Sequence, residues 1–387
     1  MRKLAVIVGL WAVFWVQSAF GDIVIDFTPV TNPIGAAIEA RPSIAGAGLL
    51  IVDFDGNQLI EKYWGNFDRS SRIPIGSATK WLSAGVMMSL VDDGLLDLDR
   101  PVGEVLPIFA GRPDGKSEMT VRQMFSHTSG SPGQSPFVNS TSLTFAESVN
   151  RIGLLTPMQS APGEEFRYGA VSMHVAGRMA EVVGGADWLT LFENRIEQPL
   201  GVSDVTFDGV GDELNSRIAA GAVTSIETFS RFMTMLAANG EYNGQQVLSA
   251  ASVAEILTDQ TAFGNPSGAI LDFKPDTIGE YLGYGVGNWI ERRGADGQPL
   301  EFTSPGGFGT TPWIDLENRY WGVFFVDDQL TTFDPLIDDV RSYTSSQISS
   351  VPEPSSGALL LAVFACSTLL RKRFQKSTTA DRKDTTC

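Results

Sequence analysis

The sequence predicts an α+β protein: an antiparallel sheet built from both ends of the main body, flanked by helices, with a helical lobe inserted between the two parts of the sheet. Two observations support this class. Runs typical of strands occur at 47–65 and return within 283–327. The chain between about 92 and 259 is mostly helical in pattern and is interrupted by Pro and Gly. Such an arrangement leaves a cleft between two lobes, where we expect the functional site.

The first 21 residues have the features of a secretory signal. Arg2 and Lys3 provide the positive start, an apolar run follows, and Ala-Phe-Gly at 19–21 is a small-x-small cleavage site. The alternative is a buried N-terminal strand or an uncleaved anchor. The main body then comprises residues 22–350, which is long enough for a large core and two lobes.

Within the body, a hairpin comes first. Residues 47–65 contain two apolar strands around the turn Asp55-Gly56-Asn57. A helix that contains Ser77 follows, at the boundary between the sheet and the helical lobe. The later expected elements are helices at 119–126, 144–153, 171–183, 187–197, 226–239 and 249–258, strands at 283–291, 312–316 and 320–327, and a last helix at 335–347.

Ser77 and Lys80 are the first candidate catalytic residues. They lie three positions apart, so a helix places them on one face. The rest of 73–90 is largely apolar, which predicts a buried helix, and a lysine there is unusual unless it is paired or has a function. Burial near a helix N-terminus lowers the lysine pKa and makes the amine a base. The plainer alternative is a serine N-cap followed by a solvated lysine.

Charge and cysteine content argue against several classes of function. The chain has 28 basic and 45 acidic residues; the first 21 residues hold two basic ones, and 351–387 hold six basic and three acidic, which leaves the body with a net charge of −22. This charge argues against nucleic acid or an anionic surface as a partner. Both cysteines lie in the tail, and the two histidines have no zinc-binding spacing. We therefore expect no metal and no cofactor.

Five segments of the body, taken in order, resemble one known family. They are the Ser-x-x-Lys segment, Phe-Ser-His-Thr-Ser-Gly at 125–130, the segment 162–185 with Tyr168, the segment 219–249, and Ser-Pro-Gly-Gly-Phe-Gly with the residues after it at 304–315. Together they span roughly residues 46–328 and resemble the serine β-lactamases and penicillin-binding proteins, on the branch of class C β-lactamases and serine esterases. The resemblance implies a β-lactamase/transpeptidase-like fold.

This resemblance implies a role for each matching residue. Ser77 is expected to be the acylated nucleophile, and Lys80 and Tyr168 to take and return its proton. A cation beside a phenol favours the phenolate, so we expect Tyr168 to be ionised readily. The N–H groups of Ser77 and of Gly307, on the later strand, are expected to form the oxyanion hole. Gly306 and Gly307 also let a substrate approach the backbone closely.

Two positions depart from the family's motifs. Ala170 stands where the family usually has an Asn that binds a substrate amide and the lysine. Ser304 stands where the family has a Lys or His that meets a substrate carboxylate, although its hydroxyl still offers a substrate contact. The two departures disfavour penicillin and D-Ala-D-Ala substrates, and they favour neutral esters or a less typical amide.

The other polar residues of these segments are assigned no part in the chemistry. The resemblance makes His127 structural, as the residue that holds the loop under the site. His174 lies within a helical pattern and is expected to pack in the core. Glu164 and Glu165 fit a solvated turn, and no class A type deacylating loop is present, so neither is expected to activate water.

The C-terminal tail predicts targeting. Residues 351–374 contain a Pro-Glu-Pro turn, an apolar stretch of 14 residues at 357–370 and a basic cluster at 371–373. This order resembles the PEP-CTERM sorting signal of exported bacterial proteins, which implies an exosortase-type partner and transient membrane association before delivery to the envelope, the surface or the medium. A plain tail anchor is the alternative, although the stretch is shorter than the roughly 20 residues that span a bilayer. The polar extension 375–387 departs from the usual signal.

Taken together, these inferences predict an exported serine hydrolase that forms an acyl-enzyme on Ser77 and acts on a small ester or amide. The leading expectation is an esterase-like activity. The alternatives are a β-lactamase, DD-carboxypeptidase or D-aminopeptidase with altered motifs, and a non-catalytic surface protein that keeps the fold for binding.

Overall fold

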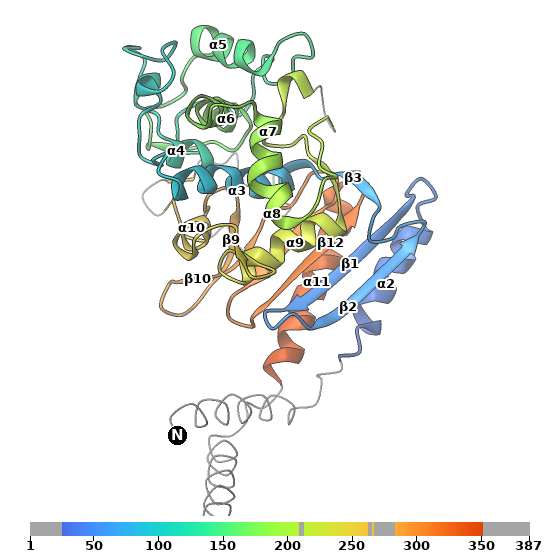
Figure 1. Ribbon diagram of the computed structural model, residues 1–387. Coiled ribbons are helices and arrows are strands. Elements are labelled where there is room, and N and C mark those ends of the chain that lie inside the picture. The colour runs from blue at the N-terminus through green and yellow to red at the C-terminus, as the bar shows by residue number, and fades with distance from the viewer. Residues whose placement is uncertain (1–24, 209–212, 262–264, 267–282, 351–387) are drawn as a thin grey trace, which may run out of the picture. The chain divides into compact units, whose positions relative to one another are not determined.

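A six-stranded antiparallel sheet, in the order β2-β1-β12-β11-β10-β9, organises the chain (Figure 1). The computed structural model describes residues 25–208, 213–261, 265–266 and 283–350. The strands are β1 (Gly46–Asp53), β2 (Gln58–Gly65), β9 (Trp289–Arg293), β10 (Pro299–Thr303), β11 (Thr311–Asp315) and β12 (Tyr320–Val326). The predicted α+β class is confirmed, because the N-terminal hairpin β1–β2 joins four strands from the C-terminal part of the body.

Residues 27–343 form one compact unit. The predicted signal at 1–21 and the predicted sorting tail at 351–387 lie outside the described residues. Within the described part of the chain, no helix is both long enough and apolar enough to cross a membrane.

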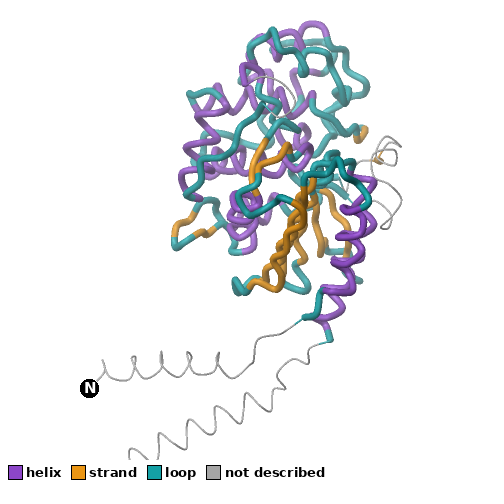
Figure 2. The backbone as a smooth tube through the Cα atoms, turned by 90° about the vertical axis from the view of Figure 1, so that its right-hand side faces the viewer, coloured by secondary structure: helices purple, strands orange, loops and turns teal. Residues whose placement is uncertain are grey.

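Helices cover both faces of the sheet, because successive residues of a strand point to opposite faces. On β12, Phe325 packs against Phe229 of α9 (Ile226–Ala237). Its neighbour Phe324 packs instead against Phe333 of α11 (Leu330–Ser349). Figure 2 shows a helix running alongside the strands. The alternation on β12 therefore gives the unit three layers, with the sheet in the middle.

The inserted lobe is built around the helix α3 (Thr79–Asp92). Its other helices are α4 (Val121–Phe125), α5 (Phe145–Leu155), α6 (Val171–Gly184), α7 (Trp188–Phe192), α8 (Gln198–Leu200) and α10 (Ala250–Ile256). Every residue of α3 from Thr79 to Leu90 is buried, as expected for a helix that is apolar on all sides. α3 contacts α6, α7 and α10, and a Cβ added at Gly85 would lie 2.9 Å from the Phe232 ring on α9. The helix therefore lies between the lobe and the helix that covers the sheet.

The structure differs from the sequence prediction at several elements. The strand predicted at 283–291 begins only at Trp289, because the chain before it turns at Gly287, where φ is +82°. Strand β10 and the helix α2 (Thr28–Glu39) have no counterpart in the prediction. Proline explains both omissions: Pro299 opens β10 and Pro33 lies inside α2, and proline argues against regular structure in a sequence pattern.

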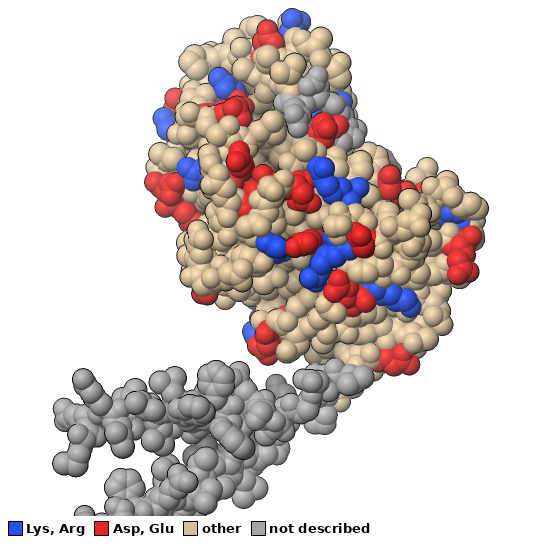
Figure 3. Space-filling view, turned by 45° about the vertical axis from the view of Figure 1, so that its right-hand side comes forward, with Lys and Arg blue, Asp and Glu red and all other residues tan. Residues whose placement is uncertain are grey.

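Acidic and basic side chains are interspersed on the face of the molecule shown in Figure 3. The acidic side chains of this face are therefore not gathered into one patch. Mixed charges of this kind are typical of a solvated surface.

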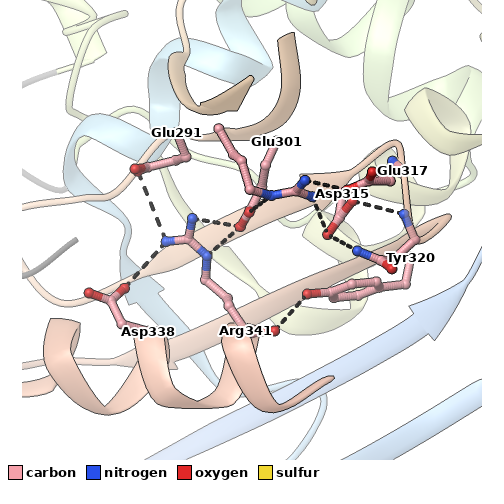
Figure 4. A network of polar contacts seen from close by, with 9 residues as sticks. Glu291, Glu301, Asp315, Glu317, Tyr320, Asp338 and Arg341 are labelled. Carbon is pink, nitrogen blue, oxygen red and sulfur yellow. Dashed lines mark hydrogen bonds and ion pairs between the residues drawn. The ribbon is translucent and has the colours of Figure 1, made fainter. Parts of the chain in front are cut away.

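A buried ion-pair network attaches α11 to the sheet (Figure 4). The Arg341 guanidinium lies 2.6 Å from a carboxylate oxygen of Glu301 on β10, 3.3 Å from Asp338 and 4.0 Å from Glu291 on β9. These four side chains are between 3% and 10% exposed. Buried charges of this kind are tolerated only when they keep their partners, so Arg341 is a stabilising residue for strands β9 and β10.

Replacement of Arg341 by Met is expected to lower the free energy of unfolding by about 3–5 kcal/mol, because the buried carboxylates lose their shared guanidinium. Urea denaturation measures this change. Arg319→Met is the matched control: the Arg319 side chain is 64% exposed and 3.8 Å from Asp55, so its loss is expected to cost less than about 1 kcal/mol. Equal losses in the two variants would contradict the importance of the network.

Candidate active site

Ser77 lies in a single 3₁₀ turn (Gly76–Ala78) that leads directly into α3. The N-cap of α3 is Ala78 and no side chain caps the helix, so Ser77 does not act as the serine N-cap of the plainer alternative. The turn is fixed by the Thr79 hydroxyl, which donates to the carbonyl of Gly76 at 2.6 Å and accepts from the N–H of Ala222 at 3.0 Å. These bonds leave the Ser77 hydroxyl available for other contacts.

Lys80 directs its amine at this hydroxyl. The Lys80 Nζ lies 3.0 Å from the Ser77 Oγ and 2.9 Å from the carbonyl oxygen of Ala219. The residue is 2% exposed, and no carboxylate within the described residues forms an ion pair with it. Burial lowers the pKa of Lys80 from 10.5 to about 7, since desolvation disfavours the charged amine. The predicted Ser-x-x-Lys contact is therefore present in the structure, and a substantial fraction of the amine is neutral near physiological pH.

Tyr168 reaches the same hydroxyl from the loop between β4 (Glu165–Phe166) and α6. Its side chain hydrogen-bonds Ser77, and the Lys80 Nζ lies 4.5 Å from the centre of its ring. Two glycines hold the loop: a Cβ at Gly169 would lie 2.0 Å from the carbonyl oxygen of Gly133. The structure thus brings together the three residues that the sequence analysis proposed as catalytic.

The protonation state of Tyr168 differs from the expectation of a readily formed phenolate. Burial raises the pKa of Tyr168 above its ordinary value of 10.0, and the hydrogen bond with Ser77 opposes this rise only in part. The Lys80 amine lies over the ring, where its contact is with the π face. Tyr168 is therefore a neutral phenol at rest, and Lys80 is the group whose pKa suits a base.

The candidate oxyanion hole is formed by two backbone segments in close contact. A Cβ at Gly306 would lie 2.0 Å from the carbonyl of Ile75, and the position of a Cβ at Gly76 is 3.1 Å from the N atom of Gly307. Neither the Ser77 nor the Gly307 N–H donates to a backbone carbonyl in the described part of the chain. Both donors can therefore serve a substrate oxygen.

The expectation that Gly307 lies on a strand is wrong. β10 ends at Thr303 and β11 begins at Thr311, so Gly307 lies in the turn between them. The turn is held from the other side, because the N–H of Leu330 donates to the carbonyl of Gly307 at 3.1 Å. The Gly307 N–H is therefore positioned by the small residues of the turn and by the start of α11. The sequence analysis had expected the hydrogen bonds of a strand to position it.

Ser304 and Ala170, the two positions that depart from the family's motifs, make different contacts. The buried Ser304 hydroxyl has one proton, which the carbonyls of Ser77 (3.2 Å) and Gly287 (3.1 Å) share as acceptors. It therefore serves the backbone of the site, whereas the sequence analysis gave it a substrate contact. Ala170 uses its N–H on the carbonyl of Gly133 at 2.9 Å, and its side chain is only a methyl group. Neither side chain offers a polar group to a substrate in this arrangement.

The histidines have the structural surroundings that the sequence analysis expected. His127 has a left-handed backbone, with φ of +60°, and its Nε2 lies 3.3 Å from the Tyr284 hydroxyl under the Tyr168 ring. Burial lowers the pKa of His127 well below 6.5, so the ring is neutral. His174 lies 2.9 Å from the Asn215 Oδ1 and 3.1 Å from the Ser148 hydroxyl in the core.

Glu164 and Glu165 make contacts with residues other than Ser77, Lys80 and Tyr168. Glu164 accepts a hydrogen bond from the N–H of Ala161 at 3.0 Å, and Glu165 forms an ion pair with Arg167. The described residues contain no group of three or more His, Cys, Asp or Glu side chains placed to hold a metal ion.

A family model described as Beta-lactamase matches residues 35–341 of the sequence. The chain belongs to the β-lactamase family. A solved structure of a Bacteroides dorei DSM 17855 protein classed with the β-lactamases is 29% identical, with a TM-score of 0.70 over 79% of this chain and 91% of that one. The match confirms the β-lactamase/transpeptidase-like fold.

Two curated relatives show the range of the family. The Esterase/beta-lactamase LipL of Mycobacterium tuberculosis is 28% identical over 163 residues, which are 40% of this chain and 37% of LipL. The D-alanyl-D-alanine-carboxypeptidase/endopeptidase AmpH of Escherichia coli is 22% identical over 339 residues, 79% of this chain and 86% of AmpH. The match thus spans well under half the length of LipL. This β-lactamase-family chain has both an esterase and a peptidase among its serine-hydrolase relatives.

Two groups at the site were missed by the sequence analysis. The Ala219 carbonyl that accepts from Lys80 belongs to the backbone, and a backbone acceptor leaves no residue-type signal in a sequence. Trp289 stacks on the Tyr168 ring, with ring centroids 5.1 Å apart. A buried tryptophan in a strand is ordinary core in sequence terms, so only the folded chain shows this contact.

Replacement of Lys80 by Met is expected to change how stability depends on pH. The folded-state pKa of about 7 lies below the unfolded value near 10.5, so between these values the unfolded chain binds more protons. The stability of the wild type should therefore rise relative to Lys80→Met from pH 7 to 10.5, by up to about 1.4 kcal/mol per pH unit. Below pH 7 the difference should be constant.

Urea denaturation of both proteins at pH 6, 8 and 10 measures this dependence. Other titrating groups are common to the two proteins and cancel in the difference. A difference in unfolding free energy that is flat from pH 6 to 10 would show that Lys80 titrates normally in the folded chain.

Proposed function

We propose that this chain is a serine esterase that works through an acyl-enzyme on Ser77. The observation that carries the proposal is the Lys80 amine, buried without a carboxylate partner in the described residues and 3.0 Å from the Ser77 Oγ. A serine hydroxyl becomes an effective nucleophile when a base lies within hydrogen-bond reach. Family membership supports the reaction class, and the esterase assignment is the narrower step.

The geometry suggests how acylation proceeds. As the Ser77 Oγ bonds to the ester carbonyl carbon, its proton passes to the neutral Lys80 amine and the carbonyl electrons move to oxygen, which the N–H groups of Ser77 and Gly307 stabilise. When the C–O bond to the alcohol breaks, Tyr168 gives its proton to the departing oxygen and receives one from Lys80. Water then attacks the acyl carbon and gives a proton to Lys80. As the bond between that carbon and the Ser77 Oγ breaks, Lys80 passes the proton to the Ser77 Oγ and the carboxylic acid leaves.

The rim of the site supports a neutral substrate. A carboxylate-bearing substrate would need a cation, but Ser304 stands at the position of the family's cationic residue and its hydroxyl is turned to the backbone. Ala170 presents a methyl group. Phe308, next to the proposed oxyanion donor, is 36% exposed, and its ring lies 3.3 Å from the Cβ position at Gly76. An apolar ester therefore fits these surroundings better than a penicillin or a peptide with a free carboxylate.

Substitution of Ser77 by Ala is expected to abolish both covalent labelling and turnover. The full chain is treated with a fluorophosphonate probe, and mass spectrometry locates the label, which should be on Ser77. Ser83→Ala is the matched control, because it removes another buried hydroxyl of α3, one that donates to the carbonyl of Ile218. It should keep labelling and turnover.

The substrates in that experiment decide the class. p-Nitrophenyl butyrate, mono-p-nitrophenyl succinate and nitrocefin are compared, and kcat/KM for the neutral ester should exceed that for its carboxylate analogue by on the order of tenfold or more. Preferred turnover of nitrocefin would support the β-lactamase alternative. Absence of any label, with equal rates in wild type and Ser77→Ala, would leave a non-catalytic binding protein as the better account.

We also propose that the protein is exported by its N-terminal signal and handled by an exosortase-type partner through the tail from residue 351. Support comes from the order of the Pro-Glu-Pro turn, the apolar stretch and the basic cluster. The full chain and a chain ending at Ser350 are expressed in a bacterium with an exosortase, and the cells are fractionated. The full chain should pass through a membrane-bound form that the shorter chain lacks; identical fractionation would contradict the proposal.

A further inference from the structure

The Tyr168 hydroxyl has to stay beside Ser77, yet the polar groups that the resemblance assigns to this region are missing. The Ala170 side chain carries no amide group, and the Ser304 hydroxyl is engaged by the carbonyls of Ser77 and Gly287. Besides the hydrogen bond with Ser77, contacts with its ring can hold the phenol in place. This makes the neighbours of the ring the candidates for control of its hydroxyl.

One of these neighbours comes from the sheet. The Trp289 indole stacks on the Tyr168 ring, with centroids 5.1 Å apart and an angle of 22° between the planes. His127 touches the phenol at 4.6 Å in a tilted geometry, and the Lys80 amine lies 4.5 Å from its centre. Trp289 is the contact whose plane is nearly parallel to the phenol, so it restricts tilting of the ring most directly.

Trp289 is itself held rigidly. It is 2% exposed, and the Tyr284 ring stands almost perpendicular to it, with centroids 4.8 Å apart and an angle of 84°. It begins β9 and pairs in register with Thr303 of β10, the residue before Ser304. Strands position side chains more exactly than loops do. A side chain of β9 that stacks on Tyr168 can therefore fix the position of that ring, which lies on a loop of the helical lobe.

We propose that Trp289 is a positioning residue, which holds the plane of Tyr168 so that the hydroxyl stays in reach of Ser77 while the acyl-enzyme forms. The inference rests on the proposed esterase function. Trp289 does not touch the reacting atoms; it acts through Tyr168, whose O–H protonates the leaving alcohol. Loss of the stack should therefore slow the chemical step and leave substrate binding nearly unchanged.

The experiment measures kcat and KM for p-nitrophenyl butyrate in the full chain and its variants. Trp289→Leu should lower kcat by on the order of 10²-fold, the usual effect of a misplaced catalytic group, with KM changed less than about twofold. Trp289→Phe should retain most of kcat, because a phenyl ring can still stack. The same replacement in a Tyr168→Phe background should cost little more, since neighbouring residues that act through one group are not additive.

A control separates positioning from lost packing. Trp321→Leu removes a tryptophan of equal exposure, 2%, from β12 of the same sheet. Urea denaturation shows whether both leucine variants are folded and equally destabilised. Equal kcat losses in Trp289→Leu and Trp321→Leu, or an undiminished loss in the Tyr168→Phe background, would overturn the inference. Failure of the esterase proposal looks different, because the wild type would then show no turnover dependent on Ser77.

Discussion

The burial of the Lys80 amine, which forms no ion pair with a carboxylate of the described residues, is the constraint on which the site depends. Lys80 belongs to the helix α3, whose residues from Thr79 to Leu90 are all buried. Its amine contacts the Ser77 hydroxyl and the Ala219 carbonyl. Desolvation brings its pKa to about 7. A carboxylate partner would raise that pKa and remove the base. The apolar character of α3 is therefore as much a part of the chemistry as the lysine itself.

Around this amine the site is held mainly by backbone. Gly306 lies so close to the Ile75 carbonyl that a Cβ would come within 2.0 Å of it, and Gly169 approaches the Gly133 carbonyl equally closely. Ser304, which has replaced a cationic residue of the family's pattern, ties the Ser77 turn to the Gly287 loop. The side chains that would read a substrate's polar groups are reduced, while the framework for acyl transfer is kept.

The two parts of the fold contribute different functions to this framework. The helical lobe supplies the proposed nucleophile, base and phenol. The sheet supplies the Trp289 stack, and the turn between β10 and β11 supplies the second proposed oxyanion donor. The network at Arg341 attaches α11 to β10, the strand that leads into this turn. The proposed substrate, a neutral ester, brings no charge into a site that holds a neutral phenol and an amine with a pKa of about 7.

The sequence by itself indicated the fold class and the pairing of Ser77 with Lys80, because hydrophobic periodicity and a three-residue spacing are local. Tyr168 was added to this pair only by the resemblance of the segment 162–185 to the family. It could not give the α2 helix or strand β10, since proline obscured their patterns. Only the tertiary structure decided that Tyr168 is neutral, that Ser304 faces the backbone, that Gly307 lies in a turn, and that Trp289 stacks on the phenol. These four depend on burial and on contacts between segments far apart in the chain, for which residue types at a given spacing carry no signal.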